Sequence, residues 1–214
     1  MIKELSIYLS DISMYSIVLP AIAGLILFNR MSKVQRVIWL LVLLSVLTEV
    51  IARWVRNTDE FQNLVYYIFT LCEFILLSYI FMQTLVPFFR RAFLLTLIIF
   101  FCLFVIVDMV WLSGLAAFNS YSTAVEGLLI IFLILCYFYK TLQELRIKYL
   151  EREPLFWVST GVLLYFSSNL FIFLFTNYIN SSTRALFIIW GIHAIFGILL
   201  NVLYTLALWV TPKP

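Results

Sequence analysis

Long apolar blocks separated by short polar clusters make up almost the whole chain. Seven blocks can be delimited by charge and turn clusters, at about 13–29, 37–56, 62–84, 92–112, 122–139, 155–176 and 184–210. Each has roughly the 17–25 residues that an α-helix needs to cross the hydrocarbon core of a bilayer. The sequence does not show the short segments of alternating apolar and polar residues that are typical of membrane β-barrels. The chain is therefore predicted to be an all-α membrane protein, with one seven-helix domain over residues 1–214.

Composition agrees with this class. The chain is 64% hydrophobic and 12% charged, with a mean hydropathy of +1.08, which lies far outside the range of soluble proteins. The opening MIKELSIYLSD has no basic region or small-residue cleavage site, so the first block is expected to be a retained helix rather than a signal peptide. The lipid bilayer is the expected partner. The scattered basic residues do not indicate binding to nucleic acid.

The distribution of basic residues predicts the orientation. With the N-terminus outside, the cytoplasmic side carries ten basic residues, namely Arg30, Lys33, Arg36, Arg90, Arg91, Lys140, Arg146, Lys148, Arg152 and Lys213. The outer side then carries four, namely Lys3, Arg53, Arg56 and Arg184. The positive-inside rule therefore favours an outer N-terminus and a cytoplasmic C-terminus. The segment 140–154 is predicted to extend the fifth helix as far as Pro154, and it offers a docking surface for a cytoplasmic or membrane protein partner.

Five ionisable side chains fall inside the apolar blocks: Glu49, Glu73, Asp108, Glu126 and His193. Such groups cost several kcal/mol at the bilayer centre, about 2.5–3.5 on insertion scales, so each is a hypothesis for a functional site. With the predicted orientation, all five lie in the outer half of the membrane or at its midplane. Glu73 has no basic residue within reach on its own helix, and His193 is its natural partner from another helix.

Polar residues at helical spacing define a candidate pocket. In the third block Asn63, Tyr66, Thr70 and Glu73 recur at 3-4-3 spacing, which places them on one helix face; polar residues of the seventh block are spaced in the same way. The predicted pocket comprises Glu73, His193, Glu49, Glu126, Tyr66, Thr70, Asn169 and Asn201. The first and fourth blocks lack such stripes, so they are expected at the periphery, with Asp108 close to the surface.

Structural explanations compete with a pocket for the same residues. Glu49 precedes Arg53 by four residues, the spacing of a helical ion pair. Glu126 and Asp108 lie near enough to the interface to be hydrated. A lone histidine such as His193 is as often a hydrogen-bonded packing residue as a titrating one. Hydroxyl and amide groups in the last two blocks also serve as interhelical hydrogen-bonding groups.

The sequence shows few of the patterns that indicate a cofactor-binding or catalytic site. Retinal requires a lysine within a span, and every lysine falls in a loop or tail. A metal would have Glu73, Glu126, Glu49 and His193 as its ligands, but a Glu-x-x-His pair and the histidine cluster of ceramidase-like hydrolases are missing. A G-x-S-x-G elbow is also missing. No cofactor and no catalytic residue are predicted, and the sequence favours a protein that is not an enzyme.

Four motifs resemble a family of small uncharacterised bacterial seven-helix membrane proteins. They are TEVIARW with Glu49, YYIFTLCEF with Tyr67 and Glu73, FWVSTGVLLYF, and IHAIFGILLNVLY with His193 and Asn201. The resemblance covers nearly the whole chain. It implies the seven-helix architecture and the bacterial inner membrane, and it implies no activity.

Four functions are compatible with these observations. The preferred hypothesis is a receptor-like sensing or binding module, in which a small ligand, ion or proton reaches Glu73 and His193 from outside. The alternatives are a proton- or cation-coupled transporter or channel, a metal-dependent intramembrane hydrolase, and a scaffold subunit. Sensing ranks before transport because polar residues become sparse toward the cytoplasmic side.

Overall fold

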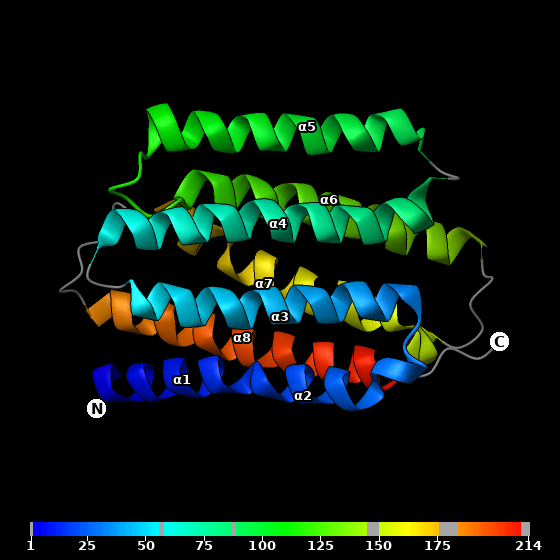
Figure 1. The fold of residues 1–214 in the computed structure, drawn as a ribbon, viewed down its shortest axis with the longest axis horizontal. Coiled ribbons are helices and arrows are strands. Elements are labelled where there is room, and N and C mark those ends of the chain that lie inside the picture. The colour runs from blue at the N-terminus through cyan, green and yellow to red at the C-terminus, as the bar shows by residue number, and fades with distance from the viewer. Residues whose placement is uncertain (1, 56–57, 87–88, 145–149, 176–183, 211–214) are drawn as a thin grey trace. The chain divides into compact units, whose positions relative to one another are not determined.

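The computed structural model describes residues 2–55, 58–86, 89–144, 150–175 and 184–210, and every regular element in these ranges is a helix (Figure 1). The elements are α1 (Ile2–Ser16), α2 (Val18–Leu27), the 3₁₀ turn η1 (Phe28–Arg30), α3 (Lys33–Trp54), α4 (Asp59–Leu85), α5 (Arg91–Val107), the π-helical turn η2 (Asp108–Leu112), α6 (Ser120–Glu144), the 3₁₀ turn η3 (Leu150–Arg152), α7 (Pro154–Phe175) and α8 (Arg184–Trp209).

Six helical segments are long and apolar enough to cross a membrane. They are Ile2–Arg30, Lys33–Trp54, Asp59–Leu85, Arg91–Leu112, Ser120–Glu144 and Leu186–Trp209. Because a bilayer offers no water to satisfy backbone groups, continuous helices are the expected solution for such sequences. The prediction of an all-helical membrane protein is thus confirmed at this level.

Two predicted boundaries are wrong. The first helix begins at Ile2, well before residue 13, because LSIYLSD continues the helix instead of leading into it. Pro154 does not end an extension of the fifth helix. That helix ends at Glu144, residues 145–149 lie outside the described residues, and Pro154 is the first residue of α7. Proline suits the first helical position because the N–H that it lacks would be unpaired there in any case.

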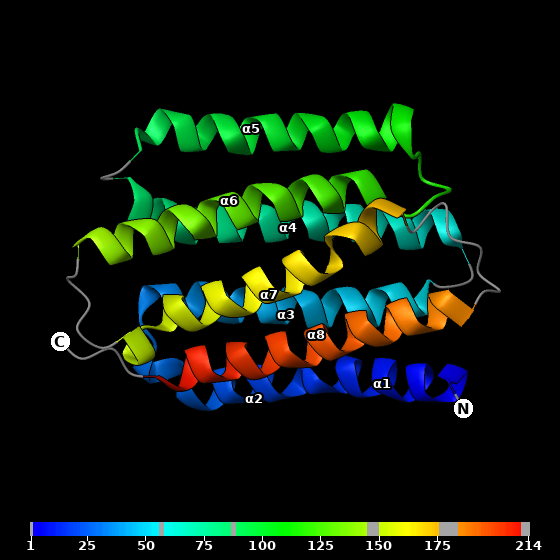
Figure 2. The ribbon, with the colours of Figure 1, turned by 180° about the vertical axis from the view of Figure 1, so that it is seen from behind.

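Contacts divide the chain into two compact units. The first comprises residues 1–46 and 150–214. In it α8 packs against α1 and α2 along one side and against α7 along another (Figures 1 and 2). The second unit comprises residues 47–149, in which α4 packs against α6 and α5.

Small residues permit close helix packing in the first unit. A Cβ atom on Gly197 would lie 2.6 Å from Ser13 Oγ, which places α1 directly against α8. One step earlier along both helices, a Cβ atom on Gly191 would lie in ordinary contact with Ser6, at 4.0 Å. The expectation that the first span has no polar face is therefore wrong, because its serines lie N-terminal to, or at the edge of, the predicted block.

Gly24 provides a test of this packing. A Cβ atom at Gly24 would overlap the indole ring of Trp39, which also donates a hydrogen bond from Nε1 to Ala21 O at 3.1 Å. We expect Gly24→Ala to lower the free energy of unfolding by about 1–3 kcal/mol through overpacking. The control is Gly191→Ala, where the nearest atom would lie 3.8 Å away, and its expected effect is below about 0.5 kcal/mol. Thermal unfolding in detergent measures both, and equal effects would contradict the packing.

Gln35 joins the start of α3 to the end of α8. Its Oε1 accepts a hydrogen bond from Ser32 N at 2.9 Å, and its own N–H donates to Ser32 Oγ at 3.3 Å, which is a capping box. Its Nε2 donates to three carbonyl oxygens at the end of α8, those of Ala207 (2.9 Å), Leu208 (3.2 Å) and Val210 (2.7 Å). One buried side chain therefore caps two helix ends.

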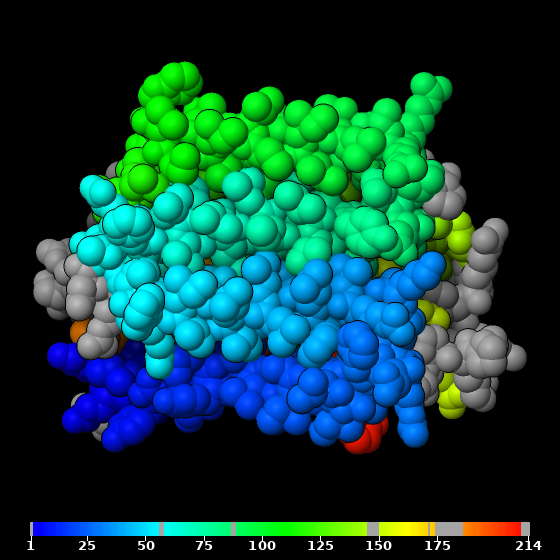
Figure 3. Space-filling view, in the orientation of Figure 1, coloured from blue at the N-terminus to red at the C-terminus, as the bar shows by residue number. Residues whose placement is uncertain are grey.

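Each unit also exposes extensive apolar side chains. Large apolar residues are exposed on α2 and on α5, among them Leu25, Ile26, Ile99 and Leu103. Figure 3 shows these two helices, in blue and green, as surfaces of closely spaced side chains. Exposed apolar faces of this extent are typical of surfaces that contact lipid.

Candidate functional site

The α4–α6 pair carries polar groups in successive layers, beginning at the turn between α5 and α6. One contact joins Thr70, in the first half of α4, to Asn119, which immediately precedes α6. Another joins Thr84 near the end of α4 to Lys140 near the end of α6, so the two helices run parallel. Three polar layers follow from that turn, and Lys140 closes the far end of the helix pair.

Asp108 forms the first layer. Its Oδ1 accepts a hydrogen bond from Ser113 Oγ at 2.7 Å, and its Oδ2 accepts hydrogen bonds from Ser122 N at 2.9 Å and Ser122 Oγ at 2.5 Å. The residue has 0% exposed surface. The predicted position of Asp108 close to the surface is therefore wrong, because a carboxyl group with this many donors can be buried without unpaired acceptors.

The location of Asp108 explains its burial. The helix α6 begins at Ser120, so the Ser122 N–H is one of the N-terminal donors without a partner inside that helix. The Asp108 carboxyl group caps that end from another element, where the helix dipole also favours negative charge. Gly114 turns the chain between them with a φ of +69°, which glycine adopts without steric cost.

The second layer connects α4 to the same turn. Asn63 Nδ2 donates a hydrogen bond to Leu115 O at 2.9 Å, and the Tyr67 hydroxyl interacts with Asp108 and Ser113. One step deeper, Asn119 Nδ2 donates to Thr70 Oγ1 at 2.9 Å. The structure thus places the predicted site residue Thr70 against Asn119, which sequence reasoning missed although it stands immediately before the helix as a typical N-cap residue.

Glu73 and Glu126 form the third layer. Glu126 is 1% exposed, Glu73 is half-buried, and their carboxyl groups are close enough to interact electrostatically. Glu126 Oε1 is buried and has no hydrogen-bond partner in the described part of the chain. Simple hydration at the interface, one explanation for Glu126, therefore does not describe its surroundings.

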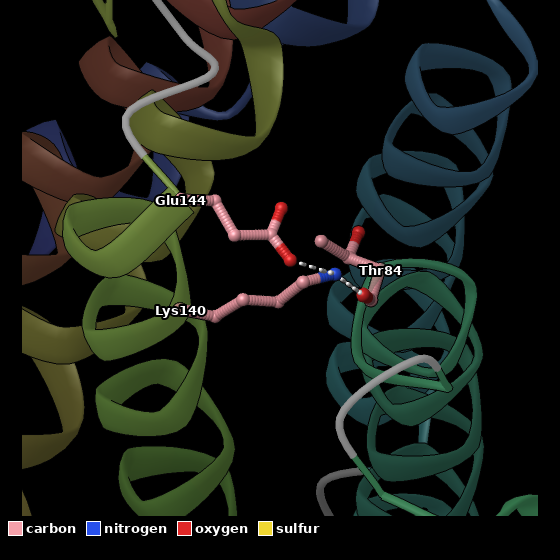
Figure 4. A network of polar contacts seen from close by, with 3 residues as sticks. All are labelled: Thr84, Lys140 and Glu144. Atoms are coloured by element: carbon pink, nitrogen blue, oxygen red, sulfur yellow. Dashed lines mark hydrogen bonds and ion pairs between the residues drawn. The ribbon is translucent and has the colours of Figure 1, made fainter.

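Beyond this pair the helices meet through apolar side chains. Leu77 and Phe81 of α4 and Ile130 and Ile134 of α6 are fully buried. Ser78 and Tyr137 are buried residues of this stretch that carry a hydroxyl group. The far end is closed by Lys140, whose Nζ donates to Thr84 O near the end of α4 and lies 3.9 Å from Glu144 Oε1 (Figure 4). A cation suits this position because the last carbonyl groups of a helix carry partial negative charge.

Glu49 and Tyr66 lie apart from these layers. Glu49 is half-buried on α3, where it interacts electrostatically with Arg53, in keeping with the spacing of the predicted ion pair. It also interacts with the half-buried Tyr66 of α4. The structure brings these three residues together as one small group.

In the other unit, His193 of α8 meets Asn169 of α7. His193 Nδ1 lies 3.1 Å from Asn169 Oδ1, and Asn169 Nδ2 donates to Tyr165 O at 2.7 Å. Because the second bond orients the amide, its oxygen accepts from an Nδ1–H on the imidazole, a tautomer assigned from this network. The rings of Tyr165, Phe173 and Trp190 surround the imidazole, with centroids 5.5, 5.8 and 5.3 Å away.

Asn201 of α8 makes hydrogen bonds to a neighbouring helix. Its Nδ2 donates to Ser16 Oγ at 2.7 Å and to Ser13 O at 3.4 Å, both on α1. These bonds join α8 to α1 beside the close approach at Gly197. Asn201 was predicted as a pocket residue, but its described contacts are those of an interhelical hydrogen-bonding group.

Glu73 and His193 lie in different compact units. Within the described residues, no three His, Cys, Asp or Glu side chains gather as a metal site would require. The structure thus defines the chain as an all-helical protein with six candidate membrane spans and buried polar groups between helices. No family model, curated protein or solved structure matches it, and the resemblance to bacterial seven-helix proteins stays a prediction.

Proposed function

We propose that the protein is a receptor-like binding module of seven membrane spans in the bacterial inner membrane, with its N-terminus outside and its C-terminus in the cytoplasm. The seventh span is α7, a 22-residue helix. It runs antiparallel along α8, since Asn169 meets His193 and Gly161 approaches Leu203. A helix that accompanies a candidate span over this length covers the same depth. The excess of basic residues on the cytoplasmic side supports the orientation.

The observation that carries this proposal is the end of the polar layers at Glu73 and Glu126. Polar side chains lead from the α5–α6 turn to this pair, and mainly apolar side chains fill the helix interface beyond it. A polar line that stops in the middle of the membrane suits binding of a ligand from one side. A transport route along these helices would need polar groups on both sides of the pair.

His193 supplies the second binding group of the proposal. Asn169 fixes its ring through Nδ1, and its Nε2 has no hydrogen-bond partner within the described residues. A neutral imidazole held in this way presents the Nε2 lone pair to a donor group of a ligand. Glu73 and His193 belong to different compact units, and the proposal assigns a ligand-binding group to each of them.

Ligand-dependent stability tests the proposal. We expect one additive from a panel of cations, lipids and small acids to raise the melting temperature of the detergent-purified protein by about 5–10 °C at saturating concentration, since it binds only the folded state. The scans cover roughly pH 5–9, where histidine and buried carboxyl groups titrate. Glu73→Gln and His193→Ala should each abolish the shift.

The matched control is Glu60→Gln, the same change at an exposed position near the start of α4. It should leave the shift intact. A shift that survives both Glu73→Gln and His193→Ala would remove these residues from the binding site. If no additive changes the stability of the wild-type protein, the polar groups only hold helices together and the scaffold function takes the place of the receptor function.

A further inference from the structure

The connection between α2 and α3 carries a cluster of exposed basic side chains, Arg30, Lys33 and Arg36, which we name the basic turn. Between Asp11 and Glu49 the chain has these three basic residues and no acidic one. Within the described ranges of the chain, no ion pair to any of the three is found. The basic turn therefore keeps its positive charge uncompensated.

Buried neighbours hold the backbone of the basic turn in place. Met31 is 6% exposed, and its N–H donates a hydrogen bond to Phe28 O at 3.3 Å. Gln35 is 2% exposed and binds the end of α8 through its Nε2. The exposed basic side chains alternate with these two anchors along the chain. A cluster presented by a fixed backbone loses little conformational entropy when it binds a ligand.

An aromatic ring orients the Arg36 side chain. The guanidinium lies over the ring of Phe28, with Cζ 5.3 Å from the ring centroid. Phe28 packs in turn against Trp39, at a centroid distance of 5.2 Å, and the Trp39 indole is fixed by its hydrogen bond to Ala21 O. A cation–π contact positions a guanidinium without using its N–H groups. Those groups match the geometry of two oxygen atoms on one phosphate.

Exposed apolar side chains continue from the basic turn along both helices. On α3, Leu40 and Leu43 follow Arg36 at spacings of four and three residues, which places all three on one helix face. Leu40 is 52% and Leu43 is 37% exposed. The last turns of α2 also expose large apolar residues, namely Ile22, Leu25 and Ile26. Positive charge at the end of an apolar helix surface complements a lipid with an anionic head above its acyl chains.

We propose that the basic turn binds the headgroup of an anionic phospholipid. The phosphate oxygens accept hydrogen bonds from Arg36 and Lys33, Arg30 adds a third positive charge, and the acyl chains lie along the exposed surfaces of α2 and α3. A zwitterionic headgroup carries a cation of its own, so the uncompensated cluster favours an anionic lipid. The inference goes beyond the proposed receptor function, because it uses none of the residues assigned to ligand binding there.

Native mass spectrometry of the full-length protein in detergent tests the proposal, with phosphatidylglycerol and phosphatidylcholine of identical acyl chains as the two probes. Each basic side chain near a lipid surface is expected to contribute about fivefold in affinity. Lys33→Gln/Arg36→Gln should therefore weaken phosphatidylglycerol binding by about 25-fold, and added salt should weaken the wild-type binding. Phosphatidylcholine binding should be the same in both proteins, which also shows that the variant is folded.

The matched control is Arg90→Gln/Arg91→Gln, which removes the same charge at two other exposed positions. It should leave phosphatidylglycerol binding nearly unchanged, because these residues form no part of the proposed site. Equal losses in the two double variants would reduce the effect to the overall charge of the protein and overturn the proposal. Equal affinity of the wild type for both lipids would overturn it as well.

Two further comparisons identify the source of the bound group. Inorganic phosphate at equal ionic strength should not displace the lipid, and displacement would assign the site to a free anion and overturn the proposal. Glu73→Gln and His193→Ala should leave phosphatidylglycerol binding intact. Loss of lipid binding in these variants would place the lipid in the receptor pocket and overturn the inference, whereas a missing ligand response with intact lipid binding removes only the receptor function.

Discussion

Asp108→Ala is expected to lower the free energy of unfolding by about 3–5 kcal/mol. The carboxyl group accepts three hydrogen bonds at a fully buried position, and its removal leaves the Ser122 N–H and two serine hydroxyl groups without their acceptor. The loss also removes the cap from the first turn of α6 and opens a small cavity. Thermal or denaturant unfolding of the purified protein in detergent measures the change.

Two variants separate the cap from the rest of this network. Asp108→Asn keeps the volume and one acceptor oxygen, but the amide nitrogen has no lone pair for Ser122, so a smaller loss of about 1–2 kcal/mol is expected. Ser113→Ala removes only one hydroxyl donor and should cost about 0.5–1.5 kcal/mol. If Asp108→Ala costs no more than Ser113→Ala, the carboxyl group does not cap α6.

Gln35→Glu is expected to cost about 3–5 kcal/mol, although the two side chains have the same shape. The new carboxyl group retains an acceptor for Ser32 N but has no N–H to donate to the carbonyl groups at the end of α8. Three carbonyl oxygens would then face an oxygen at a site only 2% exposed, and a negative charge there also opposes the helix dipole.

Unfolding experiments on three variants check this prediction. Gln35→Ala removes the hydrogen bonds between the start of α3 and the end of α8 without adding repulsion. It should lower the free energy of unfolding by about 2–4 kcal/mol. Ser32→Ala affects the start of α3 alone, and its expected cost is about 1 kcal/mol. A Gln35→Glu protein as stable as the wild type would show that Gln35 does not hold the end of α8.

Three helix ends are capped by side chains from other elements of the structure. Asp108 caps the start of α6, Lys140 caps the end of α4, and Gln35 caps the end of α8, in each case from another element. The first and last turns of a helix have donors and acceptors that the helix itself cannot pair. Since water is scarce near a membrane interior, side chains from neighbouring helices take its place. These residues therefore serve the fold, although they are polar groups inside or beside apolar segments.

Local patterns were sufficient for part of the candidate site. The spacing of Asn63, Thr70 and Glu73 placed them along one side of a helix, and the structure turns Asn63 and Thr70 toward the α5–α6 connection. Ser32 and Gln35 also form a capping box that the S-x-x-Q spacing makes readable. Such features depend on residues a few positions apart, so periodicity alone can reveal them.

Contacts between distant segments were not accessible in this way. Asp108 was expected near the surface because its helix has no polar stripe, but its partners come from the next helix across a turn. His193 was expected to pair with Glu73, whereas within its own unit it meets Asn169. Helical periodicity says which side of a helix is polar and leaves open which helix covers that side.

The sequence by itself determined the membrane class, the helical architecture and most helix ranges, because crossing hydrocarbon requires long apolar segments with all backbone groups paired internally. Only the tertiary structure decided that Glu126 is almost completely buried, that Gln35 reaches the end of α8 and that Asn201 holds α1. The physical reason is that these partners are chosen by packing. Close approaches such as Gly197 to Ser13 fix the register between helices, and the register decides which polar groups meet.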